Sequence, residues 1–375
     1  MKNKKLQYKY FLILLFPLAL LINILSTMNA KLTERVYSTA VYKVISQVIS
    51  RIFGIFPFSV AEILVVLLVC IIIWRITVLI VKVVRAKSGR LKLVLNSAGN
   101  LMIFFSIIYF FFVVLWGLNY NRQYLSDIMG LEIRNSSVDE LVNLCESLID
   151  DANDLRDKLN DTDYGMNVSD GGKAYFRDAL KRAYKGYVEA AKIYPELGGT
   201  YGTPKPVFLS ELMSYTATWG IYVPFTAEAN VNVSIPNFMI PSTACHEMAH
   251  QRGFAREDEA NYIAYVTSMM HPDYDFQYSG TMLALIESMN ALYDNDKSAY
   301  RSLYNNLSEE VRADLNKISE HNDQYESPVG EISSKVNDVY LKANNQKDGE
   351  KSYGRVVDLL LAEYRKKAQQ MNTGT

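Results

Sequence analysis

The string His246-Glu247-x-x-His250 carries the residue types of a hydrolytic metal centre, and it holds two of the four histidines in the chain. In a helix, residues four apart lie on the same face, so both imidazoles can bind one metal ion. Glu247 then lies beside the open side of that ion. The spacing predicts a zinc centre in which Glu247 is the general base on a zinc-bound water.

A catalytic zinc ion takes three protein ligands and leaves a fourth position for water, so a third ligand is expected close by. The candidates are Glu257, Asp258, Glu259 and His271. Gly253 can end the first helix in a left-handed conformation, after which a second helix starts near Glu257 and folds back. Glu257 and Asn261 share a face of that helix, which favours Glu257 as the ligand and Asn261 as a supporting amide. Glu259 is the alternative ligand.

Cys245 directly precedes the motif and invites interpretation as a nucleophile. Adjacent helical residues point about 100° apart, so this thiol cannot easily share the metal-binding face. We expect a small buried cysteine instead. His271 and His321 are expected outside the site, the first in a loop and the second on the surface.

The segment from Ala227 to Ile235 alternates apolar and polar residues and predicts a half-buried strand that ends at Pro236. Its polar face carries Glu228, Asn230 and Asn232. An exposed edge of this strand could pair with an extended peptide substrate through main-chain hydrogen bonds. The alternative is an edge strand with a purely structural role.

Three apolar runs in the first third of the chain, at about 10–28, 58–80 and 97–120, are long enough to cross a lipid bilayer. They predict a membrane anchor over residues 1–120. Residues 121–375 have the composition of a globular domain. The expected fold is α+β and mostly helical: three transmembrane helices, then a domain with a small sheet and the H-E-x-x-H helix.

Local charge predicts the orientation of these spans. Lys2, Lys4 and Lys5 precede the first run, and a basic cluster between Lys82 and Lys92 separates the second from the third. Positive residues favour the cytoplasmic side, so three crossings place the C-terminal domain outside the cytoplasm of a multi-pass plasma-membrane protein. A cleavable signal peptide is the alternative interpretation of the first run.

The net charge of −1 and the lack of a basic stripe argue against nucleic-acid binding. Within the second run, Glu62 and Arg75 are polar exceptions, but Glu62 lies near one end and Arg75 can extend toward the basic link. Transport through three spans with so few polar groups is therefore disfavoured.

The stretch HEMAHQRGFAREDEAN resembles the zincin metallopeptidases, and within them the gluzincins, in which a helix bearing a glutamate ligand follows HExxH. Over nearly the full chain, the three apolar runs, PFTAEANVN, this stretch and the late SYGRVVDLLL resemble the bacterial membrane family called domain of unknown function 3810. The resemblance implies a membrane-tethered zincin-like domain, and it implies no particular substrate.

The sequence thus predicts a zinc-dependent peptidase, anchored in the lipid bilayer, with His246, His250 and Glu257 as ligands. The expected substrates are extended peptides or proteins at the outer membrane surface, including cell-wall peptides. The alternative is a non-catalytic metal-binding membrane module, either a pseudo-peptidase or a scaffold that binds a partner.

Overall fold

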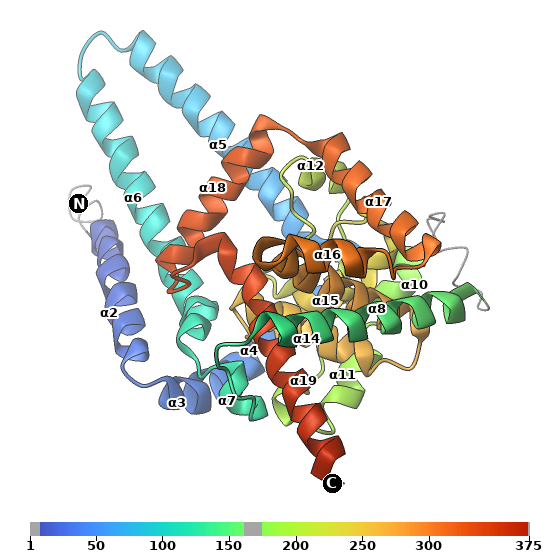
Figure 1. The fold of residues 1–375 in the computed structure, drawn as a ribbon. Coiled ribbons are helices and arrows are strands. Elements are labelled where there is room, and N and C mark those ends of the chain that lie inside the picture. Colours follow the sequence, from blue (N-terminus) through green and yellow to red (C-terminus); the bar gives the residue numbers. More distant parts are fainter. Residues whose placement is uncertain (1–7, 161–174, 374–375) are drawn as a thin grey trace.

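The computed structural model describes residues 8–160 and 175–373, and most of them are helical (Figure 1). A small three-stranded sheet accompanies the helices. The prediction of a mostly helical chain with a small sheet is confirmed. Lys2, Lys4 and Lys5, used in the orientation argument, lie outside the described residues.

Three helical segments are long and apolar enough to cross a membrane, which suggests membrane association. The first comprises η1 (Lys9–Leu14) and α2 (Leu15–Thr27), and the others are α5 (Val60–Arg85) and α6 (Arg90–Leu115). In Figure 1, α5 and α6 form a hairpin that extends away from the other helices, with α2 packed beside α6.

The third apolar helix is displaced from the expected range of 97–120. It begins at Arg90, directly after Gly89, which has a left-handed φ of 74°. It ends at Leu115 because Trp116, with φ −152° and ψ −53°, leaves the helical conformation. The expected last residues instead form η3 (Gly117–Asn121), a buried 3-10 turn. Apolar composition alone does not reveal where the backbone turns.

The segment between the first two apolar helices is itself helical. It contains α3 (Ala30–Leu32), the π-helical η2 (Thr33–Tyr42) and α4 (Lys43–Gly54). Glu34 of η2 forms a buried ion pair with Arg122, with 2.6 Å between Oε1 and Nη2. The segment is therefore fixed to the start of the globular part.

The globular part consists of short and long helices around one core. In chain order its remaining helices are α7 (Leu125–Met129), α8 (Val138–Asn160), α10 (Tyr175–Arg182), α11 (Tyr184–Ala190), η4 (Pro195–Leu197), α12 (Ser210–Ser214), η5 (Asn237–Met239), α13 (Ile240–Gln251), α14 (Glu257–Met269), α15 (Tyr274–Asn295), α16 (Lys297–Tyr304), α17 (Glu309–Tyr325), α18 (Pro328–Ala343), η6 (Gly349–Arg355) and α19 (Val356–Thr373).

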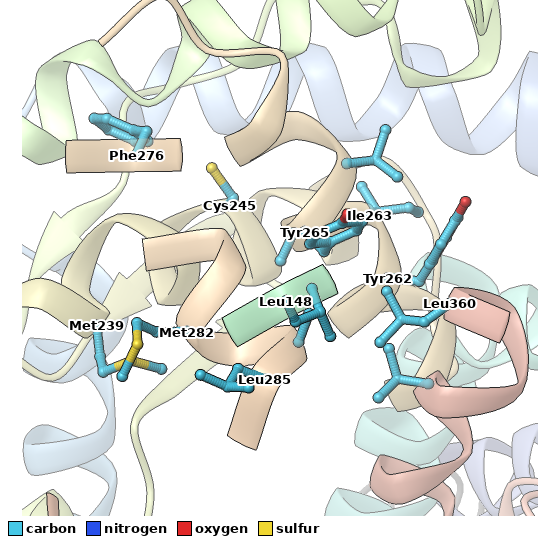
Figure 2. Close-up of a cluster of buried hydrophobic side chains, with 14 of the residues drawn as sticks. Leu148, Met239, Cys245, Tyr262, Ile263, Tyr265, Phe276, Met282, Leu285 and Leu360 are labelled. Atoms are coloured by element: carbon cyan, nitrogen blue, oxygen red, sulfur yellow. The ribbon is translucent and has the colours of Figure 1, made fainter. Parts of the chain in front are cut away.

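The core forms where α15 packs on α8 and α14, while α14 packs on α13. Figure 2 shows Leu148 of α8, Ile263 of α14, Leu285 of α15 and Leu360 of α19 meeting in this core. Each is at most 2% exposed. Burial of one such side chain contributes about 1.5–3 kcal/mol, so the core holds the two helices that carry the motif in place.

The sheet has the strand order β1-β3-β2, with β1 (Lys205–Pro206) parallel and β2 (Gly220–Val223) antiparallel to β3 (Glu228–Val231). The strand predicted over 227–235 is therefore shorter than expected. It is also the central strand and not an exposed edge. The prediction of an exposed edge on this strand, open to pairing with a peptide, is wrong, because β1 and β2 pair with its two sides.

The polar side chains of that segment are buried because they form hydrogen bonds with neighbouring elements. Glu228, Asn230 and Asn232 are all at most 2% exposed. The Glu228 carboxylate accepts hydrogen bonds from the N–H groups of Val60 and Ala61, at 3.1 and 2.7 Å, and thereby caps α5. The amide nitrogens of Asn230 and Asn232 donate to backbone carbonyls of β2 and of the loop before it. Alternation here reflects internal hydrogen bonding and not solvent exposure.

Candidate metal centre

Two consecutive helices position the motif. α13 carries the histidines and ends at Gln251, and α14 starts at Glu257. Between them Gly253 has φ 86°, and a Cβ at this position would lie 2.8 Å from a ring carbon of Tyr42. Both the left-handed backbone and the close approach require glycine. The predicted turn at Gly253 is confirmed.

The side chains of His246, His250 and Glu257 converge on one point. Their ligand atoms lie within 4.8 Å of one another. The two Nε2 atoms are 3.0 Å apart, and Oε2 of Glu257 lies 3.2 Å from the first and 3.4 Å from the second. These three groups, one of them half-buried and two buried, could hold a single metal ion.

The outer ring nitrogens of both histidines have acceptors. Nδ1 of His246 lies 2.7 Å from Oδ1 of Asn261, and Nδ1 of His250 lies 2.7 Å from the carbonyl oxygen of Phe254. An N–H at each Nδ1 leaves the lone pair on each Nε2 directed at the shared point. Asn261 therefore orients a histidine across the helix pair, rather than the glutamate on its own helix.

The alternative ligands are used elsewhere in the structure. Oε1 of Glu259 accepts hydrogen bonds from the Leu125 N–H and from the Arg256 guanidinium, each at 2.9 Å. His271 is buried, and its Nε2 lies 3.1 Å from the carbonyl oxygen of Arg182. Neither belongs to the converging group.

Cys245 and His321 also lie apart from the candidate ligands. Cys245 is fully buried, and Figure 2 shows its side chain among the hydrophobic core. Burial raises the pKa of its thiol to about 11, which disfavours a nucleophilic thiolate at neutral pH. His321 packs against Tyr325 on α17, with ring centroids 4.8 Å apart.

Glu247 is 3% exposed, and its Oε2 has no hydrogen-bond partner among the described residues. Desolvation raises the pKa of this carboxyl to about 7, against the lowering effect of the two nearby imidazoles. A Cβ on Gly220 would lie 2.3 Å from its Oε1, so a larger residue at that point of β2 would displace the Glu247 carboxyl. The carboxyl is thus buried beside β2, with one of its oxygens lacking a hydrogen-bond partner among the described residues.

The charges of the converging group depend on one another. Desolvation raises the pKa of Glu257, but the imidazoles of His250 and His246 outweigh it and lower that pKa well below its usual range. Desolvation lowers the pKa of His250, but the Glu257 carboxylate outweighs this effect and raises the value to about 9. In the metal-free protein at neutral pH, a carboxylate therefore faces an imidazolium.

Aromatic residues from η2, from the residue after α6 and from β2 form a wall of this centre. The Tyr42 hydroxyl donates to the His250 carbonyl oxygen at 3.1 Å and lies 3.0 Å from the hydroxyl of Tyr222. The Trp116 ring meets the His250 ring edge-on, with centroids 5.7 Å apart. The sequence did not single out these residues, because aromatics beside an apolar run are common at any membrane interface.

Two further phenols lie near the cluster. The hydroxyls of Tyr120 and Tyr340 are 3.1 Å apart. Desolvation raises the pKa of Tyr340, and the Glu257 carboxylate raises it further. The chain contains 26 tyrosines, and nothing in the sequence distinguishes Tyr120 and Tyr340 from the others.

A cavity of about 420 Å³ lies elsewhere, between α15, α16 and α17. Its lining includes Leu285, Met289, Tyr300 and Tyr304, together with neutral polar side chains. It contains none of the candidate ligands and no carboxylate. This cavity therefore does not coincide with the converging group between α13 and α14.

The family described as "Protein of unknown function (DUF3810)" matches residues 37–361, which include both motif helices and two of the apolar helices. The chain belongs to this family. No curated protein and no solved structure matches it. The predicted resemblance to this family is confirmed, whereas the match does not test the predicted resemblance to zincin metallopeptidases.

Proposed function

We propose that this DUF3810 protein is a membrane-anchored zinc peptidase with ligands His246, His250 and Glu257. The observation that carries the proposal is the convergence of their three ligand atoms at separations of 3.0–3.4 Å. Two ligand atoms, each about 2.05 Å from a tetrahedral zinc ion, are about 3.3 Å apart. The donor set of two imidazoles and one carboxylate also suits zinc.

Zinc in such a site lowers the pKa of a bound water to about 7 and polarises a substrate carbonyl. Glu247 supplies the proton acceptor. Burial raises the pKa of this carboxyl in the metal-free protein to about 7, and its Oε2 has no hydrogen-bond partner among the described residues, which suits a group that accepts a proton near neutral pH. The same carboxyl can then pass the proton to the leaving amine. This division of roles relates the centre to the zincin metallopeptidases.

The substrate is proposed to run along β2. This strand is at one edge of the sheet, and Ile221 is 49% exposed. An extended peptide that paired with it would pass Gly220, whose backbone touches Glu247. β2 thus offers the exposed edge for peptide pairing that β3, as the central strand, does not have. Peptides or proteins at the membrane surface, including cell-wall peptides, are the proposed substrates.

The test uses the full chain in detergent or nanodiscs, because residues between the apolar helices complete the centre. Zinc is measured by elemental mass spectrometry, and cleavage is measured against a peptide library. Glu247→Gln is expected to retain one zinc while losing cleavage about 10²–10⁴-fold. Glu310→Gln, on α17, is the matched control and should behave like the unmodified protein. Zinc-loaded protein that cleaves nothing would overturn the proposal.

One observation favours a second function. Glu247, His250 and Glu257 are each at most 8% exposed, which is typical of a closed structural metal site. In that case the metal stabilises the fold of a non-catalytic membrane module. Removal of zinc would then lower the melting temperature, and Glu247→Gln would change no reaction.

A further inference from the structure

Helix α18 exposes an apolar stripe. Val329, Ile332, Val336 and Val339 are 56, 61, 64 and 66% exposed. With about 100° between successive helical residues, the four fall within an arc of roughly 80° on one face. A contiguous apolar face of this kind marks a surface that is covered by another apolar phase or by a partner.

The rest of α18 has the distribution expected of an amphipathic helix at an interface. Its charged residues occupy a separate arc: Glu331, Lys335, Asp338 and Lys342. Leu341, on a third side, is 1% exposed and packs toward the protein. The apolar stripe therefore points away from the body of the protein, with the charged arc along one side of it.

The C-terminal end of α18 is tied to α6. The ring of Tyr340 packs edge-on against that of Phe112, with centroids 6.2 Å apart. Phe112 lies in the last turn of α6, which ends at Leu115. This end of α18 is thus level with the end of an apolar helix.

The N-terminal end of α18 is tied to the loop that follows α12. The Ser327 hydroxyl donates to the carbonyl oxygen of Tyr215 at 2.8 Å, and the same oxygen lies 3.3 Å from where a Cβ on Gly330 would be. In Figure 1, α18 runs from the vicinity of α12 toward α6.

The segment that leads into α12 is in turn bound to α5. The Glu62 carboxylate, in the first turn of α5, accepts hydrogen bonds from the N–H groups of Phe208 and Leu209 at 2.9 and 2.8 Å. Phe208 is 92% exposed and Leu212 is 59% exposed. A second apolar group therefore lies at the end of α5 that faces the globular part.

We propose that these two groups form one membrane-embedded collar. The collar consists of Phe208, Leu212, Val329, Ile332, Val336 and Val339. α5 and α6 are joined at their far ends by a short turn around Gly89, so their near ends reach the same side of a bilayer. α18 lies between α6, which Tyr340 contacts, and the α12 segment, which is bound to α5, and its apolar stripe points outward. The acyl chains of one leaflet cover it, and the charged arc lies at the headgroups.

The experiment places an environment-sensitive nitrobenzoxadiazole label on the full chain in phosphatidylcholine and phosphatidylglycerol vesicles. The background is Cys70→Ala, since Cys145 and Cys245 are buried. Val336→Cys reports the stripe. Lys335→Cys, one residue away on the charged arc, is the matched control. Ile332→Cys gives a second stripe position if the first variant fails to fold.

The stripe labels are expected to show blue-shifted emission, several-fold stronger quenching by doxyl lipids than the control, and protection from aqueous iodide. Equal iodide quenching at positions 335 and 336 would overturn the proposal. Disulfide-linked dimers through Val336→Cys, without lipid quenching, would also overturn it by showing that a second copy covers the stripe. None of these readouts depends on zinc or on peptide cleavage.

Discussion

Glu228 and Glu247 are buried to the same degree, at 2% and 3% exposure, yet they are bound in opposite ways. Both oxygens of Glu228 accept backbone hydrogen bonds from the first turn of α5. Glu247 keeps one oxygen without a partner among the described residues, beside two histidines. A buried carboxylate with all its hydrogen bonds joins two parts of a fold, whereas one left without partners beside metal-binding side chains is available for chemistry.

The largest expected effect separates these two glutamates. Glu247→Gln should reduce cleavage about 10²–10⁴-fold, because an amide cannot accept the proton. Glu228→Gln should instead lower the free energy of unfolding by about 1.5–3 kcal/mol, because the N–H groups of Val60 and Ala61 lose a charged acceptor. Turnover and thermal unfolding of both variants in the same detergent measure the contrast. Equal losses of unfolding free energy in the two variants would contradict the assignment of a structural role to Glu228 and a catalytic role to Glu247.

Replacement of the third ligand should nearly abolish zinc binding. Loss of a group that only orients a ligand typically weakens metal affinity by about 10–100-fold. Glu257→Ala removes a ligand itself, so the loss of zinc affinity is expected to be larger than that. Glu259→Ala is the control, since its carboxylate is bound to Leu125 and Arg256. Competition with a zinc-chelating dye gives both affinities. A larger loss of zinc affinity in the Glu259 variant would show that Glu259, and not Glu257, is the third ligand.

Asn261→Ala should have an intermediate effect on zinc affinity. The variant removes the acceptor 2.7 Å from Nδ1 of His246 while leaving all three ligands in place. A loss of about 10–100-fold in zinc affinity is expected. The same dye competition measures it, and an unchanged affinity would show that the helix backbone alone orients this imidazole.

The smallest expected effect is the pH dependence of zinc binding. In the metal-free protein His250 has a raised pKa of about 9, so at pH 7 it must release a proton before it can bind zinc. Affinity should therefore rise about tenfold from pH 7 to pH 8 and level off above pH 9. Calorimetry in buffers of different ionisation enthalpy counts the released protons. A pH-independent affinity would contradict the charge state assigned to the pair of His250 and Glu257.

Local spacing predicted much of the centre, because its parts are close in sequence. His246 and His250 are one helical turn apart, and Gly253 supplies the reversal that brings Glu257 back to them. The capping box of α8 is equally local: Ser137 and Glu140 exchange hydrogen bonds at 3.0 and 3.2 Å. In both cases residue type and spacing determine the geometry over a few residues.

Features that depend on distant parts of the chain were missed or wrong. The alternation around Asn230 is compatible with a solvent-facing strand, but β1 and β2 pair with both its edges and leave it buried. Tyr42 lies 208 residues from the carbonyl of His250 to which it donates. A single sequence contains no local signal for such contacts, because they depend on how the apolar helices dock on the globular part.

That contact between Tyr42 and the His250 carbonyl attaches the histidine helix to the chain segment linking the first two apolar helices. With those helices in a bilayer, this contact would hold the candidate ligands at a constant height above the lipid. A centre at constant height acts at a constant distance from the membrane surface. If the centre is the proposed peptidase, it would cut a protruding chain at a set number of residues from the point where that chain leaves the membrane, whatever the side chains at that position.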